Sequence, residues 1–253
     1  MRKLAALATF CLLLAACGNS DSTDQAAVQE NAAVDTAPAL TPGAQSVGQV
    51  TIDDTPIDYV TVTPDGFEVG DTAPVLLAMP PGGQDLSLTE SVTAGVYATK
   101  ALARGWVVVS PAAPESGLYF EGSEELIPGF LDWMETWVSP EGDRPHLAGI
   151  SNGGISSFRL VAEQPDAFAS VLVFPGFARG DDDKAALADL ADIPVRLFVG
   201  EQDTNWVSSG QTTFDVLDEA GADVVLEIVP GEGHSIGTLR DGVRVFDELD
   251  AAR

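Results

Sequence analysis

Two residue types that proteins use for cross-linking and metal binding are almost missing from this sequence. The 253 residues include only two cysteines, Cys11 and Cys17, and only two histidines. Clusters of cysteine and histidine with the spacing of metal ligands are therefore excluded. The sequence also lacks a glycine-rich phosphate loop and a dinucleotide-binding fingerprint. We expect neither a metal nor a cofactor.

Positive charge is scarce as well. Twelve lysines and arginines stand against 39 aspartates and glutamates, and the formal net charge is −27. Because binding to phosphates needs clustered basic residues, nucleic acid is excluded as a partner. Hydrophobic residues make up 45% of the chain, which is enough for the core of one large domain.

The N-terminus has the pattern of an export signal. Arg2 and Lys3 precede an apolar run, Leu4 to Ala16, that is too short to span a bilayer comfortably. The run ends in Leu14-Ala15-Ala16-Cys17-Gly18, which resembles the lipobox of bacterial lipoproteins. An ordinary signal peptide followed by a chance cysteine is the alternative.

The lipoprotein resemblance implies cleavage before Cys17 and a lipid on its sulfur. Residues 1–16 are then a signal peptide, and the protein is anchored to a bacterial membrane on the extracytoplasmic side. Gly18, where an aspartate often retains such proteins in the inner membrane, favours the outer membrane if the cell has one. Cleavage removes Cys11, so the mature chain has one cysteine and no internal disulfide.

Residues 17–46 are predicted to be a disordered tether, and residues 47–253 a folded domain. Gly18 to Ser46 is rich in Ala, Asp, Gln, Thr and Ser and has almost no large apolar residues. Without such residues the segment cannot bury enough apolar surface to order itself.

Strand and helix patterns then alternate along the domain. Polar and apolar residues alternate first, as in half-buried antiparallel strands, at Gln49–Ile52 and Ile57–Val62. Continuous apolar runs follow, typical of buried parallel strands, at Val75–Met79, Trp106–Ser110, Ser170–Phe174, Val195–Val199 and Val224–Val229. Helical spacing appears at Leu88–Ala103, Leu126–Val138, Val207–Ala220 and Leu239–Leu249. The order predicts an α/β fold with a doubly wound, mainly parallel sheet and an N-terminal antiparallel hairpin.

One motif carries candidate chemistry. Gly149-Ile150-Ser151-Asn152-Gly153 matches G-x-S-x-G between an apolar strand, His146–Ile150, and a helical stretch, Ile155–Gln164. Strand, glycine-bounded turn and helix are the context of a nucleophile elbow. Ser151 is therefore the candidate nucleophile, and the Asn152 N–H is placed to stabilise an oxyanion.

A serine nucleophile needs a base, and the chain has only two histidines from which to choose. His146 lies at the start of the elbow's own strand, so its ring cannot reach the strand's carboxyl end. His234 directly follows the last predicted strand, in a loop that opens at the same sheet edge as the elbow. We therefore assign His234 as the base and a structural role to His146.

The orienting acid should lie between serine and histidine in the chain. Asp203 follows a buried strand and precedes a helix at the same sheet edge, and we select it. Glu201 is a neighbouring alternative. Asp181, Asp182 and Asp183 follow the preceding strand, and we interpret them as a solvated run of charge.

The second oxyanion donor is expected in the loop Pro80-Pro81-Gly82-Gly83-Gln84-Asp85. Prolines have no N–H, so the donor is Gly82, Gly83 or Gln84, and we favour Gly83 or Gln84. The alternative is an ordinary Pro-Gly turn without a donor role, which would have the same sequence.

The chain from about residue 47 to its end resembles the α/β-hydrolase fold family. The resemblance rests on the elbow, on the Gly-Glu-Gln-Asp loop ending at Asp203, and on the Gly-Glu-Gly-His loop ending at His234. Ser-Asn-Gly-Gly is similar to the secreted esterase, polyhydroxyalkanoate depolymerase and dienelactone-hydrolase-like branches. Many of these have His-Gly where this chain has Pro80-Pro81. The resemblance implies acyl transfer from an ester to water.

We expect a carboxylesterase that acts on small-molecule or polymeric esters. Ala178 to Ile193 is too short for a large cap, which predicts an open site, with Trp206 and Tyr119-Phe120 as candidate substrate contacts. A serine peptidase or polyester depolymerase is the enzymatic alternative. A catalytically silent binding lipoprotein is the alternative from another class.

Overall fold

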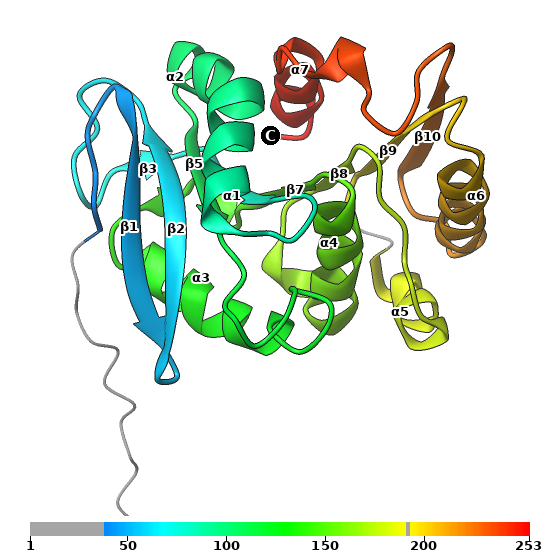
Figure 1. The fold of residues 1–253 in the computed structure, drawn as a ribbon, viewed down its shortest axis with the longest axis horizontal. Helices are drawn as coiled ribbons and strands as arrows, with labels where there is room; N and C mark the ends of the chain where they lie inside the picture. Colours follow the sequence, from blue (N-terminus) through cyan, green and yellow to red (C-terminus); the bar gives the residue numbers. More distant parts are fainter. Residues whose placement is uncertain (1–37, 191–192) are drawn as a thin grey trace, which may run out of the picture. The chain divides into compact units, whose positions relative to one another are not determined.

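An eight-stranded sheet organises the part of the chain that the computed structural model describes, residues 38–190 and 193–253 (Figure 1). Its order is β1-β2-β5-β4-β7-β8-β9-β10. β1 and β2 form an antiparallel hairpin, β2 pairs antiparallel with β5, and the other neighbours are parallel. The predicted fold class is thereby confirmed. The strands are β1 Ala44–Ile52, β2 Thr55–Thr63, β4 Val75–Met79, β5 Val107–Pro111, β7 His146–Gly149, β8 Val171–Val173, β9 Val195–Gly200 and β10 Val224–Val229.

Helices cover both faces of this sheet. One face packs against α3, α4, α6 and the turn Leu187–Leu190, through buried side chains such as Phe130, Phe158 and Leu217. The other face packs against α2 and α7, through Ala101, Phe246 and Leu249. The helices are α1 Leu86–Val92, α2 Thr99–Arg104, α3 Ile127–Glu135, α4 Asn152–Glu163, α5 Asp181–Ala186, α6 Thr204–Glu219 and α7 Val243–Ala251. Short 3₁₀ turns lie at Glu124–Leu126, Glu141–Asp143, Pro165–Ala167, Leu187–Leu190 and Gly237–Leu239, and a two-stranded ribbon pairs β3 Thr72–Ala73 with β6 Ser139–Pro140.

The helix predicted over Leu88–Ala103 is one continuous element with an irregular middle. Asp85 caps its start by accepting a hydrogen bond from the Leu88 N–H (3.0 Å), and Gly105 ends it with a φ of 76°. Between α1 and α2 the backbone takes π-helical geometry over Thr93–Ala98. Such π turns occur often beside functional sites, and this one lies on the wall of the cavity described below.

The folded part begins earlier than predicted. β1 starts at Ala44, and residues before it already contact β2: the Ala39 N–H donates to the Tyr59 hydroxyl (3.1 Å), and the Thr61 hydroxyl donates to the Ala39 carbonyl (3.2 Å). The boundary at Val47 is therefore wrong, because residues from Ala39 onward are held by hydrogen bonds to β2, which composition does not report. The signal peptide, Cys17 and most of the predicted tether lie outside the described residues.

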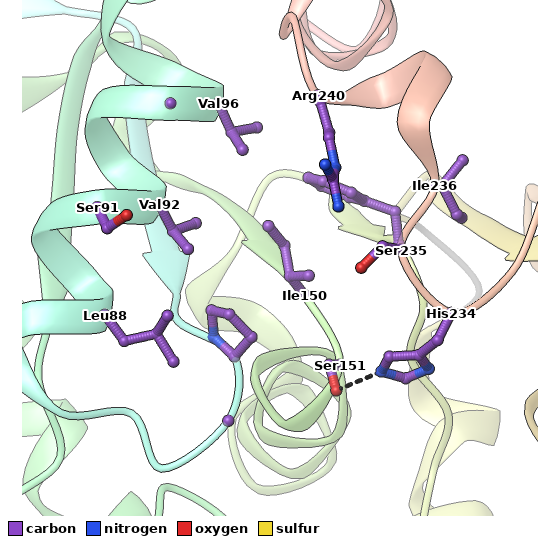
Figure 2. A pocket seen from close by; sticks show the side chains of 14 residues that line it. Leu88, Ser91, Val92, Val96, Ile150, Ser151, His234, Ser235, Ile236 and Arg240 are labelled. Atoms are coloured by element: carbon purple, nitrogen blue, oxygen red, sulfur yellow. Dashed lines mark hydrogen bonds between the residues drawn. The ribbon is translucent and has the colours of Figure 1, made fainter.

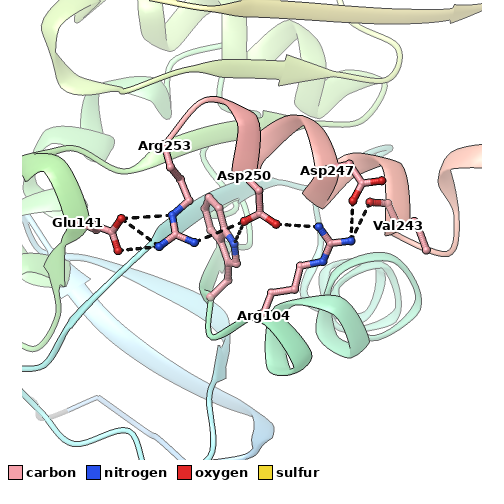
Figure 3. A network of polar contacts seen from close by, with 7 residues as sticks. Arg104, Glu141, Val243, Asp247, Asp250 and Arg253 are labelled. Carbon is pink, nitrogen blue, oxygen red and sulfur yellow. Dashed lines mark hydrogen bonds and ion pairs between the residues drawn. The ribbon is translucent and has the colours of Figure 1, made fainter.

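A network of charged residues joins α2 to the C-terminal helix (Figure 3). Arg104 donates to Asp247 and to Asp250, both at 2.7 Å. Arg253 binds Asp250 (3.5 Å) and the Glu141 carboxylate (2.8 Å). These ion pairs connect elements that are far apart in the sequence.

Within the described residues, no helix has the length and apolar character needed to cross a membrane.

His146 is a structural residue at the start of β7, as expected. Its side chain is buried, Nδ1 lies 2.7 Å from the Ser170 hydroxyl, and its ring contacts Trp106 edge-on with centroids 5.1 Å apart. Burial lowers the pKa of His146 to about 4, and the charge of Arg253 acts in the same direction.

The lowered pKa predicts a loss of stability in acid. An unfolded histidine has a pKa of about 6.5, so between that value and about 4 the unfolded chain binds the additional proton, and the free energy of unfolding falls as the pH falls. Between pH 7 and pH 4.5, the free energy of unfolding should fall in both proteins. We expect the fall to be about 2–3 kcal/mol smaller in His146→Gln than in the wild type. Urea unfolding of the wild type and the variant at both pH values measures this difference. Protonation of the carboxylates affects both proteins equally, so its contribution cancels in the comparison. Equal losses would contradict the prediction.

Candidate active site

Ser151 lies in a sharp turn between β7 and α4. Its φ and ψ are 57° and −117°, a conformation that L-residues rarely adopt and that costs on the order of 1–3 kcal/mol. The turn is held by close backbone packing: a Cβ at Gly149 would collide with the Gly153 carbonyl, and a Cβ at Gly153 with the Met79 carbonyl. Glycines on both sides therefore allow the helix to approach the sheet and present the Ser151 hydroxyl at the sheet's carboxyl edge.

His234 and Asp203 reach Ser151 from two other loops at the same edge. His234 follows β10, and its Nε2 lies 2.8 Å from Ser151 Oγ. Asp203 follows β9, and its Oδ2 lies 2.6 Å from His234 Nδ1. The Asp203 side chain is mostly buried, at 16% exposed, whereas that of His234 is 44% exposed. The structure thus brings together the three residues that the sequence selected.

The loops that carry His234 and Asp203 are tied to each other. The Gln202 N–H donates to the Glu232 carbonyl (2.8 Å), and the Gly231 N–H donates to the Glu201 carboxylate (2.8 Å). The carboxylate of Glu201, the alternative acid, therefore binds a backbone N–H and not the imidazole of His234. A Cβ at Gly200 would collide with the Gly233 carbonyl, so the two loops lie in direct backbone contact.

The acidic run after β8 differs from its predicted role. Asp183 is buried, accepts from the Gly180 N–H (3.4 Å), and pairs with Arg159 of α4 at 2.9 Å. The interpretation of all three aspartates as solvated is thus wrong for Asp183, because α5 turns this residue towards α4. Asp181 pairs with Lys184 at the surface (3.5 Å), so the run does not compete with Asp203.

The two aromatic residues proposed as substrate contacts have different surroundings. Tyr119 is fully buried, and its hydroxyl donates to the Ala112 carbonyl (2.9 Å), so its assignment to the substrate site is wrong: the loop folds inwards over the core. Burial also raises its pKa well above the usual range. Trp206 packs edge-on against His234, with centroids 4.7 Å apart, and against Phe177 (4.8 Å), and it is not among the residues that line the cavity.

The N–H groups of Gln84, one of the favoured oxyanion donors, already donate hydrogen bonds within the protein. Its backbone N–H donates to the Pro81 carbonyl (3.0 Å), closing a tight turn. Its buried side chain donates to the Pro80 carbonyl (3.0 Å) and the Ser156 hydroxyl (2.9 Å), and accepts from the Tyr119 N–H (3.0 Å). The assignment of Gln84 as a donor is wrong, and the side chain instead joins the loop to α4.

Gly82, rather than Gly83, is the glycine of this loop that lines the cavity with Ser151. The Asn152 side chain donates to the Gly82 carbonyl (2.8 Å). Because the C=O and N–H of a trans peptide point in opposite directions, the Gly83 N–H points away from Asn152. No described residue accepts a hydrogen bond from the backbone N–H of Gly82 or of Asn152.

A cavity of about 640 Å³ opens beside Ser151 (Figure 2). α1 and the π-helical segment form one wall, and the loop after His234 forms the other. Most lining side chains are apolar, and sequence reasoning missed nearly all of them. They are Pro81, Leu88, Val92, Val96, Ile150, Phe174 and Ile236. Hydrophobic periodicity marks such residues only as inward-facing, and it does not distinguish core from cavity.

The arrangement is suited to nucleophilic chemistry. In the described residues, no group of three or more histidine, cysteine, aspartate or glutamate side chains is placed to hold a metal ion. A hydroxyl, an imidazole and a carboxylate form one hydrogen-bonded chain, and the unpaired N–H of Asn152 stands at the N-terminus of α4, where the helix dipole favours negative charge.

Sequence comparisons with protein-family models and with curated proteins give no match. Comparison of the fold with solved structures gives many similar chains. The feruloyl esterase module from Clostridium thermocellum has a TM-score of 0.64 at 13% identity, covering 83% of this chain and 88% of that one. A Rhizomucor miehei esterase has a TM-score of 0.61 at 19% identity, covering 82% of this chain and 81% of that one.

A thermostable esterase is also similar, with a TM-score of 0.61 at 16% identity over 81% of this chain. This chain spans 60% of the length of that esterase. At such identities the likeness concerns the fold, and function must be argued from the site. With its strand order and its helices on both faces, the chain has the α/β-hydrolase fold.

Proposed function

We propose that this protein is a serine hydrolase that cleaves carboxylic esters through an acyl-enzyme on Ser151. The observation that carries the proposal is the unbroken hydrogen-bond chain from Ser151 Oγ through His234 to Asp203 at the mouth of the cavity. The similar solved structures include several that are described as esterases, which supports an ester as the substrate.

In the first half-reaction, Ser151 Oγ attacks the ester carbonyl carbon while His234 Nε2 takes the hydroxyl proton. The carbonyl oxygen becomes an oxyanion, which accepts hydrogen bonds from the N–H groups of Asn152 and Gly82. Asp203 accepts from the Nδ1–H and stabilises the imidazolium. When the tetrahedral intermediate collapses, the imidazolium gives its proton to the leaving alcohol.

In the second half-reaction, water attacks the acyl-enzyme. His234 takes a proton from the water, the same two N–H groups hold the new oxyanion, and the Ser151 oxygen leaves with that proton. The products are a carboxylic acid and the free enzyme. A peptidase or a polyester depolymerase would use the same steps, and a silent binding protein would use none, so activity on defined substrates separates these alternatives.

The triad can be tested by single substitutions. We expect Ser151→Ala to lower kcat/KM for a short-chain 4-nitrophenyl ester by about 10⁴-fold or more, because the nucleophile is gone. Asp203→Asn should lower kcat by about 10²–10⁴-fold, because the imidazole loses the group that fixes its tautomer. Steady-state kinetics on purified proteins measure both effects.

Glu201→Gln is the matched control for Asp203→Asn, since it removes a carboxylate from the same loop. It should keep activity within about threefold. Equal activity of Ser151→Ala and the wild type would contradict the proposal, and failure of the wild type to react with a fluorophosphonate probe would favour the silent alternative.

The oxyanion loop offers a second test. Gly82→Ala places a Cβ at a residue with a φ of 60°, a conformation that strains an L-residue, and 2.8 Å from Leu88 Cδ2. The strain favours a change of the backbone that moves the N–H. We expect kcat to fall by about 10–10³-fold with little change in KM. Gly83→Ala is the control, because its Cβ meets only the Asp85 carboxylate, at 3.7 Å. A larger loss in Gly83→Ala would indicate that Gly83 is the donor.

We further propose that the enzyme is lipid-anchored through Cys17, on the strength of its lipobox-like sequence. In a host that processes bacterial lipoproteins, metabolic labelling with a fatty-acid analogue should tag the wild type. The label should be lost in Cys17→Ser, because serine lacks the sulfur that carries the lipid. A Cys11→Ser variant should keep the label, and undiminished labelling of Cys17→Ser would rule out this anchor.

A further inference from the structure

The cavity beside Ser151 contains one permanently charged side chain, Arg240. Fourteen residues line the cavity, and none of them is an aspartate or glutamate. This is notable in a chain with 39 acidic residues and a net charge of −27. Figure 2 shows the Arg240 side chain descending from the loop after His234 towards Ile150. Arg240 is exposed to solvent. The cavity lining therefore includes a solvent-accessible positive charge on a strongly negative protein.

The guanidinium of Arg240 is available for a ligand. Within the described residues it has no hydrogen-bond or ion-pair partner, whereas most other arginines are paired with carboxylates. The paired ones are Arg104, Arg159, Arg179, Arg196, Arg244 and Arg253. An unpaired guanidinium keeps a planar set of N–H donors that matches a carboxylate in two-point geometry.

The backbone that carries Arg240 is anchored independently of its side chain. The Arg240 N–H donates to the Gly237 carbonyl (3.2 Å), and Leu239 beside it is buried. The nearby carboxylate of Glu232 is occupied by the N–H groups of Gly237 (3.0 Å) and Thr238 (3.2 Å). Glu232 therefore fixes the turn and leaves Arg240 without a neutralising partner.

The opposite wall of the cavity is held in place as well. A Cβ at Gly242, just after Arg240, would collide with the Val96 carbonyl of the π-helical segment. The loop and the helix are thus in backbone contact. The π-helical segment also contributes Gly95, which has no side chain to fill the cavity and has open space around it.

Apolar side chains share the lining of the cavity with the nucleophile and the cation. Ile150, Val92, Val96 and Ile236 line the cavity together with Ser151 and Arg240. A ligand that fills it would need its reacting carbonyl at Ser151, an apolar stretch along these side chains, and an anionic group at the guanidinium.

We propose that the preferred substrates are esters whose acyl part ends in a carboxylate, such as monoesters of dicarboxylic acids, and that Arg240 determines this preference. The inference rests on the proposed ester hydrolysis. Because the net charge of the protein repels anions at long range, the preference depends on this one local cation.

Two substrate series of equal length test this inference. Monomethyl esters of dicarboxylic acids with four to eight carbons, roughly the range that a cavity of this size accepts, are compared with methyl esters of the corresponding alkanoic acids in a pH-stat. We expect the wild type to favour the anionic series by about tenfold or more in kcat/KM. Arg240→Gln should lower kcat/KM for the anionic series by about 10–100-fold and leave the neutral series within about twofold. Arg240→Lys should retain part of the preference, because it keeps the charge without the planar fork.

Arg144→Gln is the control, since it removes the same charge from a residue that does not line the cavity. It should behave as the wild type on both series. Turnover of both series without a charge preference, or a preference that survives Arg240→Gln, would overturn the inference and leave ester hydrolysis intact. Absence of turnover on either series, with a Ser151→Ala variant indistinguishable from the wild type, would instead remove the proposed function itself.

Discussion

Direct backbone contact between α4 and the sheet is the constraint on which the candidate site depends. Gly153 lies against the Met79 carbonyl and Gly154 against the Pro175 carbonyl, at distances that no side chain tolerates. This contact presses the first turn of the helix onto the strands, and it maintains the rare backbone conformation of Ser151. The hydroxyl, the helix N-terminus and the Asn152 N–H are therefore positioned by packing, before any ligand binds.

The same sheet edge brings together residues that are remote in the chain. Ser151 and His234 are 83 positions apart, and Asp203 lies 31 positions before His234. Each follows a parallel strand, so their loops emerge at one end of the sheet. Contacts between the Asp203 and His234 loops, such as that of the Gln202 N–H with the Glu232 carbonyl, fix these loops to each other. The geometry is preorganised, which the proposed catalysis by electrostatic stabilisation would require.

Charge is distributed unevenly over this protein. Acidic residues dominate its composition, and most arginines serve as structural partners for them, as in the network of Arg104, Asp247 and Asp250 that joins α2 to α7. The cavity lining is an exception, because it has a free guanidinium and no carboxylate. A general negative field therefore coexists with a local positive site next to the candidate nucleophile, which is an arrangement suited to selecting among substrates by charge.

The sequence by itself determined the order of strands and helices, and through it the loops that carry Ser151, Asp203 and His234. These follow from local patterns: apolar runs, glycine-bounded turns, and a choice between two histidines. Only the tertiary structure decided that Gly82 lines the cavity while Gln84 and Tyr119 turn into the core, and that Arg240 enters the cavity. The direction of an N–H or a loop side chain depends on partners supplied by distant segments, and no local pattern records those partners.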